Sequence, residues 1–268
     1  MASFPPLKFT RSGHIFIGPR DNPQAIASIL DLITYQEEYC LALNFSAPFI
    51  ARLMAAGFLV MSLIPEDKPG GAAILLPEMH LKRSVLFFDQ LHESRSARRL
   101  IPRYELKTDG FAGTGPCGPA FFEEVLERCA QVHGEGWLTP ALRRSFHALY
   151  TSGVQTLHAG NLPLGPQMVS FGLFREERLV AGEFGVAAGK VYTSYSGYKE
   201  EDSAGTVQLI LAGRWLRDSG FAFWDLGMLL PYKKRLGAQA LDRREFLERF
   251  RAAQEDNQAG LPEGIPWD

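Results

Sequence analysis

The sequence S-F-G-L-F-R-E-E-R-L-V-A-G-E-F-G-V, residues 170–186, contains two apolar runs separated by a short charged turn. The runs cover residues 169–174 and 179–186, and the four residues between them are Arg-Glu-Glu-Arg. A second turn at Ala188-Gly189 precedes a third run, residues 191–196. Short runs of this kind, bounded by turn residues, predict a three-stranded antiparallel meander.

After the meander, the chain predicts a helix, a strand and another helix. Apolar side chains over residues 204–219 recur at helical spacing, and Gly220 is a typical helix stop. Residues 221–226 fit a strand, and Asp242 with Glu245 fits a capping box for a last helix. This order resembles that of the GNAT acyltransferases, so we expect a GNAT-like second half.

The first half of the chain predicts a smaller α/β unit. Residues 47–56 fit a helix, and residues 60–64, 72–76 and 85–88 fit short strands. Residues 110–119 are rich in Gly and Pro and form the best candidate linker, and further helices are predicted after Pro119 and Thr139-Pro140. We therefore expect an α+β protein, with a small N-terminal α/β domain over residues 1–109. Residues 110–268 would form the GNAT-like domain with the antiparallel meander.

The composition indicates a globular protein without a membrane segment. The chain has 268 residues, 46% apolar side chains and a net charge of -2. Cys40, Cys117 and Cys129 lack metal-ligand spacing, so neither a zinc site nor a disulfide framework is indicated. No apolar run reaches the roughly 18 residues of a membrane span, and the N-terminus lacks a signal-peptide pattern. A reduced cytoplasmic compartment is the default expectation.

A basic cluster follows the apolar run at residues 85–88. Arg95, Arg98 and Arg99 fall on one side of a predicted helical turn. A chain of net charge -2 has no general need for such a cluster, which points to a polyanion. Trp137 precedes a predicted helix and offers an aromatic plate for a base, so the pair of features suits a single-stranded RNA end. A solvated helix face and a core anchor are the alternative interpretations of the arginines and of Trp137.

Several motifs in order resemble the leucyl/phenylalanyl-tRNA–protein transferases, from about residue 47 to residue 250. They are R-x-V-L at 83–86, L-H-x-S-R-S-x-R-R at 91–99, G-x-G-W-L-T at 134–139, the meander at 170–186, Asp225, L-G-A at 236–238 and R-R-E-F-L at 243–247. The resemblance implies an enzyme of the N-degron pathway. It would transfer Leu or Phe from an aminoacyl-tRNA to the N-terminal amine of proteins that begin with Arg or Lys. No metal or organic cofactor and no membrane contact are implied, and we expect a monomer.

The resemblance also implies roles for individual residues. Asp225 matches the catalytic Asp, Trp137 would stack on the 3′ adenosine, and Arg95, Arg98 and Arg99 would follow the acceptor-stem phosphates. Tyr195 stands where the family has a catalytic Glu, and Gly227 where it has a Gln. The positions expected around the substrate are Met61, Trp137, Glu183, Tyr192, Leu209, Ala212, Leu216, Trp224 and Gly227. Glu183 replaces a Met there, and a buried Glu requires a partner or a proton.

The chemistry leaves alternative functions open. An aminoacyl ester is already activated, so its aminolysis needs positioning and a proton acceptor rather than a covalent nucleophile. With Tyr195 and Gly227 replacing family residues, a non-catalytic homologue that binds tRNA or protein N-termini is one alternative. A GNAT-type acyl-CoA acyltransferase is another, although residues 200–207, E-E-D-S-A-G-T-V, are acidic and lack its phosphate loop.

Two charged runs lie outside these motifs. Glu200, Glu201 and Asp202 are a candidate site for a cationic protein N-terminus, and they also fit an exposed polar loop. The basic run at residues 233–235, Lys-Lys-Arg, fits an exposed loop that could contact phosphate.

Overall fold

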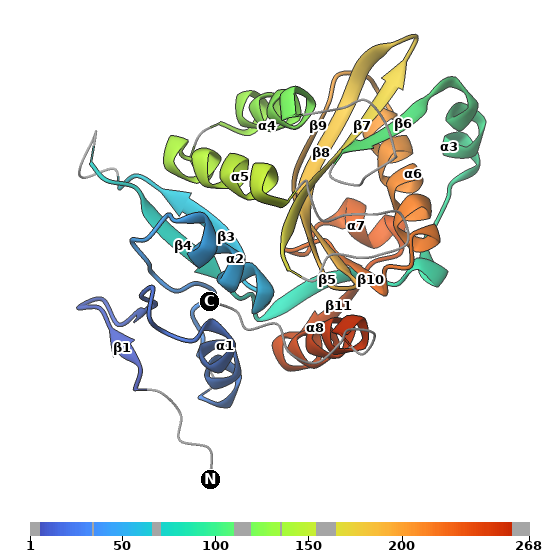
Figure 1. Cartoon of the computed structure of the whole chain (residues 1–268). Helices are drawn as coiled ribbons and strands as arrows, with labels where there is room; N and C mark the ends of the chain where they lie inside the picture. The colour runs from blue at the N-terminus through green and yellow to red at the C-terminus, as the bar shows by residue number, and fades with distance from the viewer. Residues whose placement is uncertain are drawn as a thin grey trace.

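A computed structural model describes residues 6–33, 35–65, 71–109, 119–134, 136–153 and 165–258 (Figure 1). Cys117, most of the expected linker, residues 154–164 and the tail after residue 258 lie outside the described residues. Within them, a mixed seven-stranded sheet forms the centre of the molecule. Its strands lie in the order β11 (Gln239–Asp242), β5 (Lys82–Leu86), β10 (Phe223–Asp225), β9 (Val191–Lys199), β8 (Arg178–Ala188), β7 (Gln167–Arg175) and β6 (Glu105–Asp109).

The expected meander is confirmed. Strands β7, β8 and β9 pair antiparallel, with Phe184 opposite Ser170 on one side and Ser196 on the other. The β7–β8 turn places Glu176 and Glu177 at φ of 50° and 65°, the backbone of a tight hairpin loop. Helix α6 (Ala204–Asp218) then returns the chain, and β10 pairs parallel with β9. The protein is thus α+β, and its second half has the GNAT order of elements.

Two strands of the sheet come from the segment before residue 110. Strand β5 pairs antiparallel with both β10 and β11, and β6 pairs antiparallel with β7. The expected division at residues 109 and 110 therefore does not separate two sheets. Hydrophobic pattern identifies a strand but not its partners when these lie far along the chain, and β5 lies more than a hundred residues from β10.

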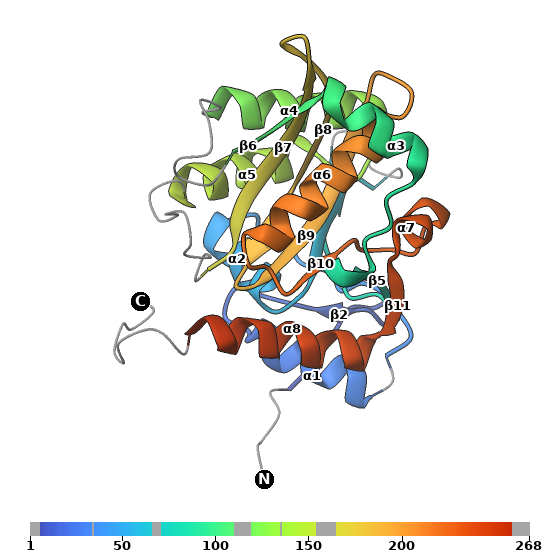
Figure 2. The same cartoon turned by 90° about the vertical axis from the view of Figure 1, so that its right-hand side faces the viewer.

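Helices cover both faces of the sheet (Figures 1 and 2). Helices α4 (Pro119–His133) and α5 (Pro140–Gly153) lie on one face, where Phe122 and Phe146 pack against Phe184 of β8. Helix α6 lies on the other face, where Ala212 and Leu216 are fully buried. These two sides of the sheet are called the α4/α5 face and the α6 face.

The N-terminal part packs against one end of the sheet (Figure 1). Its elements are β1 (Lys8–Phe9), β2 (Ile15–Phe16), α1 (Pro23–Leu32), α2 (Ala47–Ala55), β3 (Leu59–Leu63) and β4 (Ile74–Glu78). Strands β3 and β4, which correspond to two of the expected short strands, pair antiparallel as a hairpin. Helix α8 (Arg243–Gln258) lies beside α1 (Figure 2), and the Glu245 N–H donates to Asp242 Oδ1 at 2.9 Å, so the predicted cap is confirmed.

The remaining elements connect these layers. They are the short 3-10 turns η1 (Phe88–Gln90) and η2 (Ile101–Arg103), and the helices α3 (Arg95–Leu100) and α7 (Pro231–Leu236). Helix α7 and strand β11 carry no strong sequence signal and were not expected. Across the described part of the chain, no helix combines the length and hydropathy that crossing a membrane demands.

Candidate functional site

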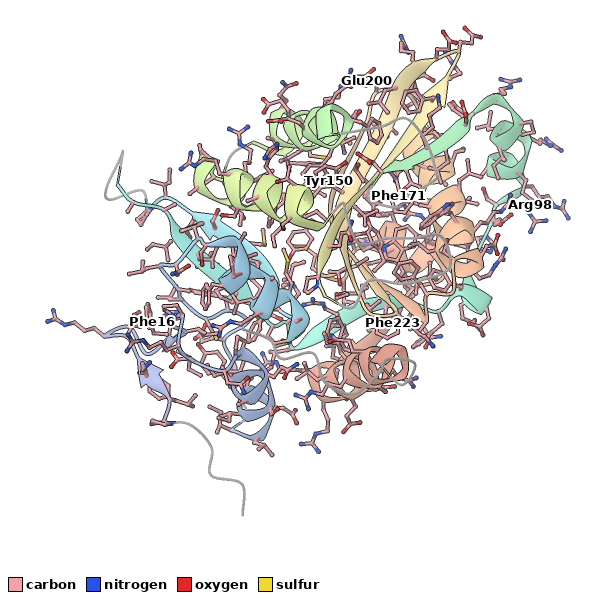
Figure 3. The ribbon with its side chains drawn as sticks, viewed as in Figure 1. Phe16, Arg98, Tyr150, Phe171, Glu200 and Phe223 are labelled. Atoms are coloured by element: carbon pink, nitrogen blue, oxygen red, sulfur yellow. The ribbon has the colours of Figure 1, made fainter. Side chains whose placement is uncertain are left out.

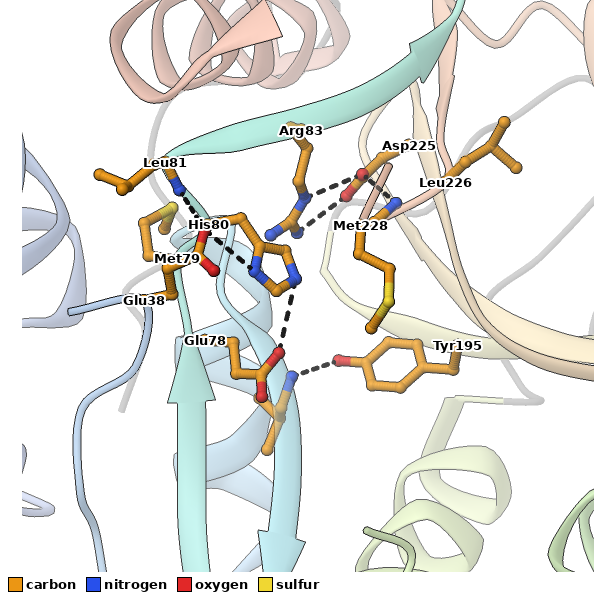
Figure 4. A network of polar contacts seen from close by, with 12 residues as sticks. Glu38, Glu78, Met79, His80, Leu81, Arg83, Tyr195, Asp225, Leu226 and Met228 are labelled. Carbon is orange, nitrogen blue, oxygen red and sulfur yellow. Dashed lines mark hydrogen bonds and ion pairs between the residues drawn. The ribbon is translucent and has the colours of Figure 1, made fainter. Parts of the chain in front are cut away.

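Asp225 ends β10 and is fully buried on the α4/α5 face. Arg83 of β5 binds it in a bidentate pair, with Nε to Oδ1 and Nη2 to Oδ2 both at 2.9 Å (Figure 4). Thr193 Oγ1 donates to Oδ2 at 3.0 Å, and the Gly227 N–H donates to Oδ1 at 2.9 Å. Four hydrogen bonds thus hold the carboxylate, which fixes both the Arg83 guanidinium and the turn after β10.

Arg83 and His80 each carry a buried nitrogen without a hydrogen-bond partner. These are Arg83 Nη1 and His80 Nε2, in side chains that are about nine-tenths or more buried. His80 follows β4, and its Nδ1 lies 3.7 Å from Glu38 Oε1. Burial and the charge of Arg83 lower the pKa of His80 to about 4, so the ring is neutral at pH 7. Each of these two nitrogens therefore has an unmet hydrogen bond inside the network.

Glu78 completes the network from the end of β4. Its Oε2 lies 3.4 Å from His80 Nε2, and its side chain is 17% exposed (Figure 4). Burial raises the pKa of Glu78 to about 7, although the charge of Arg83 opposes the shift. No sequence motif marked Glu78 or His80, because their relation to Asp225 exists only once β4, β5 and β10 are assembled.

Tyr195 lies on the same face as Asp225. It is the extra residue of a bulge in β9, since Phe184 pairs with Ser196 and Gly185 pairs with Ser194. Its hydroxyl accepts the Val60 N–H at 3.0 Å (Figure 4), and burial raises its pKa above the ordinary tyrosine range. The charges of Arg83, Asp225 and Glu78 all act on this hydroxyl, which places it beside the network.

Trp137 joins this face through a row of aromatic rings. Its indole is half-buried and stacks on Phe184 with ring centroids 6.3 Å apart, and Phe184 stacks in turn on Tyr195 at 6.2 Å. The Trp137 carbonyl accepts both the backbone N–H and the hydroxyl of Ser62 at 3.0 Å. Met61, next to Ser62 on β3, is half-buried. The structure thus brings Trp137, Met61, Tyr195, Asp225 and Gly227 to one side of the sheet.

The other expected substrate positions lie on the α6 face. Tyr192, Ala212, Leu216 and Trp224 are fully buried in one cluster, and Leu209 packs against it half-buried. The separation follows from the alternation of side chains along a strand, which sends Tyr192 and Trp224 to the face opposite Thr193 and Asp225.

Glu183 is also on the α6 face, where it is 3% exposed and fully hydrogen-bonded rather than isolated. Ser194 Oγ donates to its Oε1 at 2.6 Å, and Gln208 Nε2 donates to its Oε2 at 3.2 Å. Trp224 Nε1 donates to Ser194 Oγ at 2.7 Å. Burial raises the pKa of Glu183, and the partners supply the compensation that a carboxyl at this position requires.

The basic cluster is on the predicted helix. Arg95, Arg98 and Arg99 are all exposed on α3, and Ser94 caps the helix by accepting the Ala97 N–H at 3.2 Å. Arg98 Nε lies 3.4 Å from Glu93 Oε2, and the side chain points outward in Figure 3. Helix α3 packs beside α6 (Figure 2), so these arginines and Trp137 lie on different faces of the sheet.

Of the other charged runs, residues 200–202 form the polar turn that was one of their two interpretations, with Glu200 and Asp202 exposed. Glu200 pairs with Arg128, Glu201 with Arg175 and Arg178, and Asp202 with Lys199, so each of these carboxylates already has a cationic partner. The expectation of an exposed loop at residues 233–235 is wrong for Lys233, which is buried on α7. Its Nζ donates to the carbonyls of Leu226 and Met228, which holds the turn after Asp225.

Two surface hollows lie away from the expected site residues. One is between α4 and α5 and is lined by residues that include Glu127, Arg143 and His147. The other lies where α1 meets α8 and includes Tyr35 and Arg244. Cys40 and Cys129 are buried free thiols, and burial raises the pKa of each to about 12. Within the described ranges, no three His, Cys, Asp or Glu side chains gather closely enough to hold a metal ion.

The chain is related to known proteins over most of its length. A family model described as leucyl/phenylalanyl-tRNA protein transferase matches residues 85–251. The leucyl/phenylalanyl-tRNA–protein transferase of Pseudomonas aeruginosa (strain LESB58) is 29% identical over 177 residues, which cover 63% of this chain and 68% of that protein. The protein of the same name from Cereibacter sphaeroides is 30% identical over 196 residues, covering 70% and 79%. The crystal structure of FemX is similar with a TM-score of 0.45 at 11% identity, covering 88% of this chain and 81% of that one.

Proposed function

This chain belongs to the leucyl/phenylalanyl-tRNA protein transferase family, and on that basis we propose which reaction it performs. It transfers Leu or Phe from an aminoacyl-tRNA to the N-terminal amine of proteins that begin with Arg or Lys. The product carries a hydrophobic N-terminal residue, the kind of signal that an N-degron pathway reads. The protein acts in the cytoplasm as a monomer.

One structural observation supports the proposal in addition to family membership. The Arg83–Asp225 pair, the Tyr195 hydroxyl and the stacked row of Trp137 and Phe184 occupy the same face of the sheet. Aminolysis of an activated ester depends chiefly on holding two reactants together and managing protons. A rigid, ion-paired strand pair next to an aromatic platform suits that task, since the platform can stack the terminal adenine of the tRNA.

The tRNA stem would lie along α3. Arg95, Arg98 and Arg99 are exposed there and have the geometry to bind phosphates. Because α3 and Trp137 are on different faces, the acceptor end would pass around the sheet to reach the platform.

The direct test is an aminoacyl-transfer assay. The full chain is incubated with tRNA charged with radiolabelled Leu or Phe and with peptides that begin with Arg, Lys or, as a control, Ala. We expect label in the Arg and Lys peptides only. Absence of transfer from every charged tRNA tested would overturn the proposed reaction.

The tRNA path is tested by substitution on α3. The triple variant Arg95/Arg98/Arg99→Ala is expected to weaken tRNA binding and to flatten the slope of log K against log salt by about 2 to 3, because up to three phosphate contacts are lost. Arg20, Arg244 and Arg249 are also exposed and lie elsewhere, on the N-terminal part and α8, so their triple Ala variant is the matched control. Equal effects of the two variants would exclude a specific path along α3.

The state of Asp225 favours a second candidate function. Both of its oxygens are already taken by donors within the protein, and Tyr195 supplies no carboxylate. This favours a non-catalytic homologue that binds charged tRNA without using the ester. Such a protein would bind aminoacyl-tRNA in a filter assay and give no labelled peptide, a result that separates the two candidates.

A further inference from the structure

Tyr195 occupies the position at which the family resemblance places a catalytic Glu, yet another carboxyl lies beside it. Glu78 pairs with Leu59 across the β3–β4 hairpin, and the Tyr195 hydroxyl accepts the N–H of the next residue, Val60. The tyrosine is thus joined to the same end of the hairpin that carries Glu78 (Figure 4). The N-terminal part of the chain therefore contributes a carboxyl to the face that holds Asp225.

The surroundings of Glu78 suit a group that exchanges protons. Its side chain is mostly buried but still 17% exposed, so protons can reach solvent. The charged and titratable groups that face it are His80, Arg83, Glu38 and Tyr195. His80 Nε2 lies 3.4 Å away and has no hydrogen-bond partner, and Arg83 Nη1 is also unpartnered.

Asp225 is less suited to the same task. It is fully buried and accepts hydrogen bonds from Arg83, Thr193 and Gly227, so a proton on it would have to displace one of these donors. Its geometry is that of a positioning residue, which fixes the Arg83 guanidinium between β5 and β10.

We propose that Glu78 is the proton acceptor for the attacking α-amine, in place of the carboxylate that Tyr195 has displaced. This inference rests on the transfer reaction proposed above. Burial raises the pKa of Glu78 to about 7, close to the pH at which a general base both exists as a carboxylate and holds a proton well.

The proton and electron balance of the step is simple. The α-ammonium group loses one proton to the Glu78 carboxylate, and the freed amine attacks the ester carbonyl carbon. The C–N bond forms, the C–O bond to the tRNA ribose breaks, and the second proton of the nitrogen passes to the leaving ribose oxygen. Glu78 returns its proton to solvent through its exposed edge.

The kinetic test compares Glu78→Gln, Glu78→Asp and the wild-type chain across pH 5.5–9. We expect wild-type kcat/KM to rise through an apparent pKa near 7. Glu78→Gln should lose this rise of kcat/KM with pH, and its kcat/KM should fall by about 10²–10⁴-fold. Glu78→Asp should keep the rise with pH at a lower kcat/KM. Glu38→Gln is the matched control, because Glu38 also lies beside His80, 3.7 Å away, but is half exposed. Its pH profile should keep the rising limb at the wild-type rate, moved toward lower pH, because the charge of Glu38 contributes to the raised pKa of Glu78.

A second measurement tests the protonation of the Glu78 carboxyl group directly. In wild-type protein with ¹³C-labelled glutamate carboxyl groups, the resonance that disappears in Glu78→Gln should titrate near pH 7; titration near the ordinary value of 4.5 overturns the inference. A wild-type chain that transfers and a Glu78→Gln variant with an unchanged pH profile overturn the inference but leave the transfer reaction standing. A wild-type chain with no transfer overturns the proposed reaction itself.

Discussion

At the level of single residues, two carboxyl groups of one polar network have different hydrogen-bond partners. Asp225 is fully buried and accepts four hydrogen bonds, two of them from the Arg83 guanidinium. Glu78 faces a neutral His80 and feels Arg83 only as a more distant charge, so burial dominates and raises its pKa to about 7. For Glu78, the charge of Arg83 opposes the effect of burial but does not outweigh it.

The raised pKa of Glu78 predicts a pH-dependent cost to folding. A carboxyl whose pKa is higher in the folded chain stabilises the fold fully below its unfolded value of 4.5, and that contribution is lost as pH rises through about 7. Between pH 6 and 8 the wild type should therefore lose about 1 kcal/mol of unfolding free energy relative to Glu78→Gln. Urea unfolding of both chains at the two pH values measures this difference. A gap that does not change with pH would show that Glu78 is ionised throughout the range.

At the level of helices and strands, side-chain alternation and one bulge decide which residues meet. Alternation sends Thr193 and Asp225 to the α4/α5 face while Tyr192 and Trp224 go to the α6 face. The bulge in β9 falls at Tyr195, next to the network, and leaves that residue without a partner on β8. Residues that a sequence motif groups together can therefore lie on opposite faces of the sheet.

The end of α7 gives a prediction that separates backbone strain from crowding. Gly237 ends this helix at φ 108°, and a Cβ there would lie 2.0 Å from the carbonyl oxygen of Gln90. Gly220 ends α6 at φ 87°, but a Cβ there would meet nothing within 4 Å. Gly220→Ala should cost about 1–2 kcal/mol from the left-handed backbone alone, and Gly237→Ala at least about 3 kcal/mol because overpacking is added. If urea titration showed equal losses of unfolding free energy for the two variants, the close approach of Gln90 to Gly237 would be contradicted.

Across the complete fold, the central sheet unites segments from both ends of the chain. Strand β5 lies between β10 and β11, and the Arg83–Asp225 pair spans the same junction. Arg243, at the start of α8, donates to the carbonyls of Tyr35 at 2.7 Å and Met79 at 2.6 Å, which ties the last helix to the N-terminal part. Because of these contacts, we expect the N-terminal part and the sheet to fold together as one cooperative unit.

A fragment of residues 110–268 should therefore fail to fold on its own. It would lack β5, which leaves the edges of β10 and β11 unpaired. It would also bury Asp225 without Arg83, and removal of one partner from a buried ion pair costs about 3–5 kcal/mol. Circular dichroism during urea titration should show no sharp transition for the fragment, in contrast to the full chain. A cooperative transition for residues 110–268 would support the domain division expected from the Gly- and Pro-rich stretch.

Local elements and family membership could both be predicted from the amino-acid sequence. Apolar periodicity and turn residues identified the meander, the strands β3 and β4, α6 with its Gly220 stop and the Asp242 cap, because each of these depends on neighbours within a few residues. The motifs from residue 83 to residue 247 identified the family, which the match over residues 85–251 confirms. These signals depend on neighbouring residues or on the order of motifs along the chain, so they can be recognised in the sequence without a structure.

The surroundings of the candidate site became known only from the folded chain. Arg83 meets Asp225, and Glu78 and His80 meet Tyr195, through pairings between strands that are far apart in the sequence. Lys233 lies in a basic run yet is buried, because the turn after Asp225 offers it two carbonyls. Burial, ion pairing and the pKa of a carboxyl depend on the groups that the fold brings within a few ångströms. No pattern of neighbouring residues in the sequence identifies those groups.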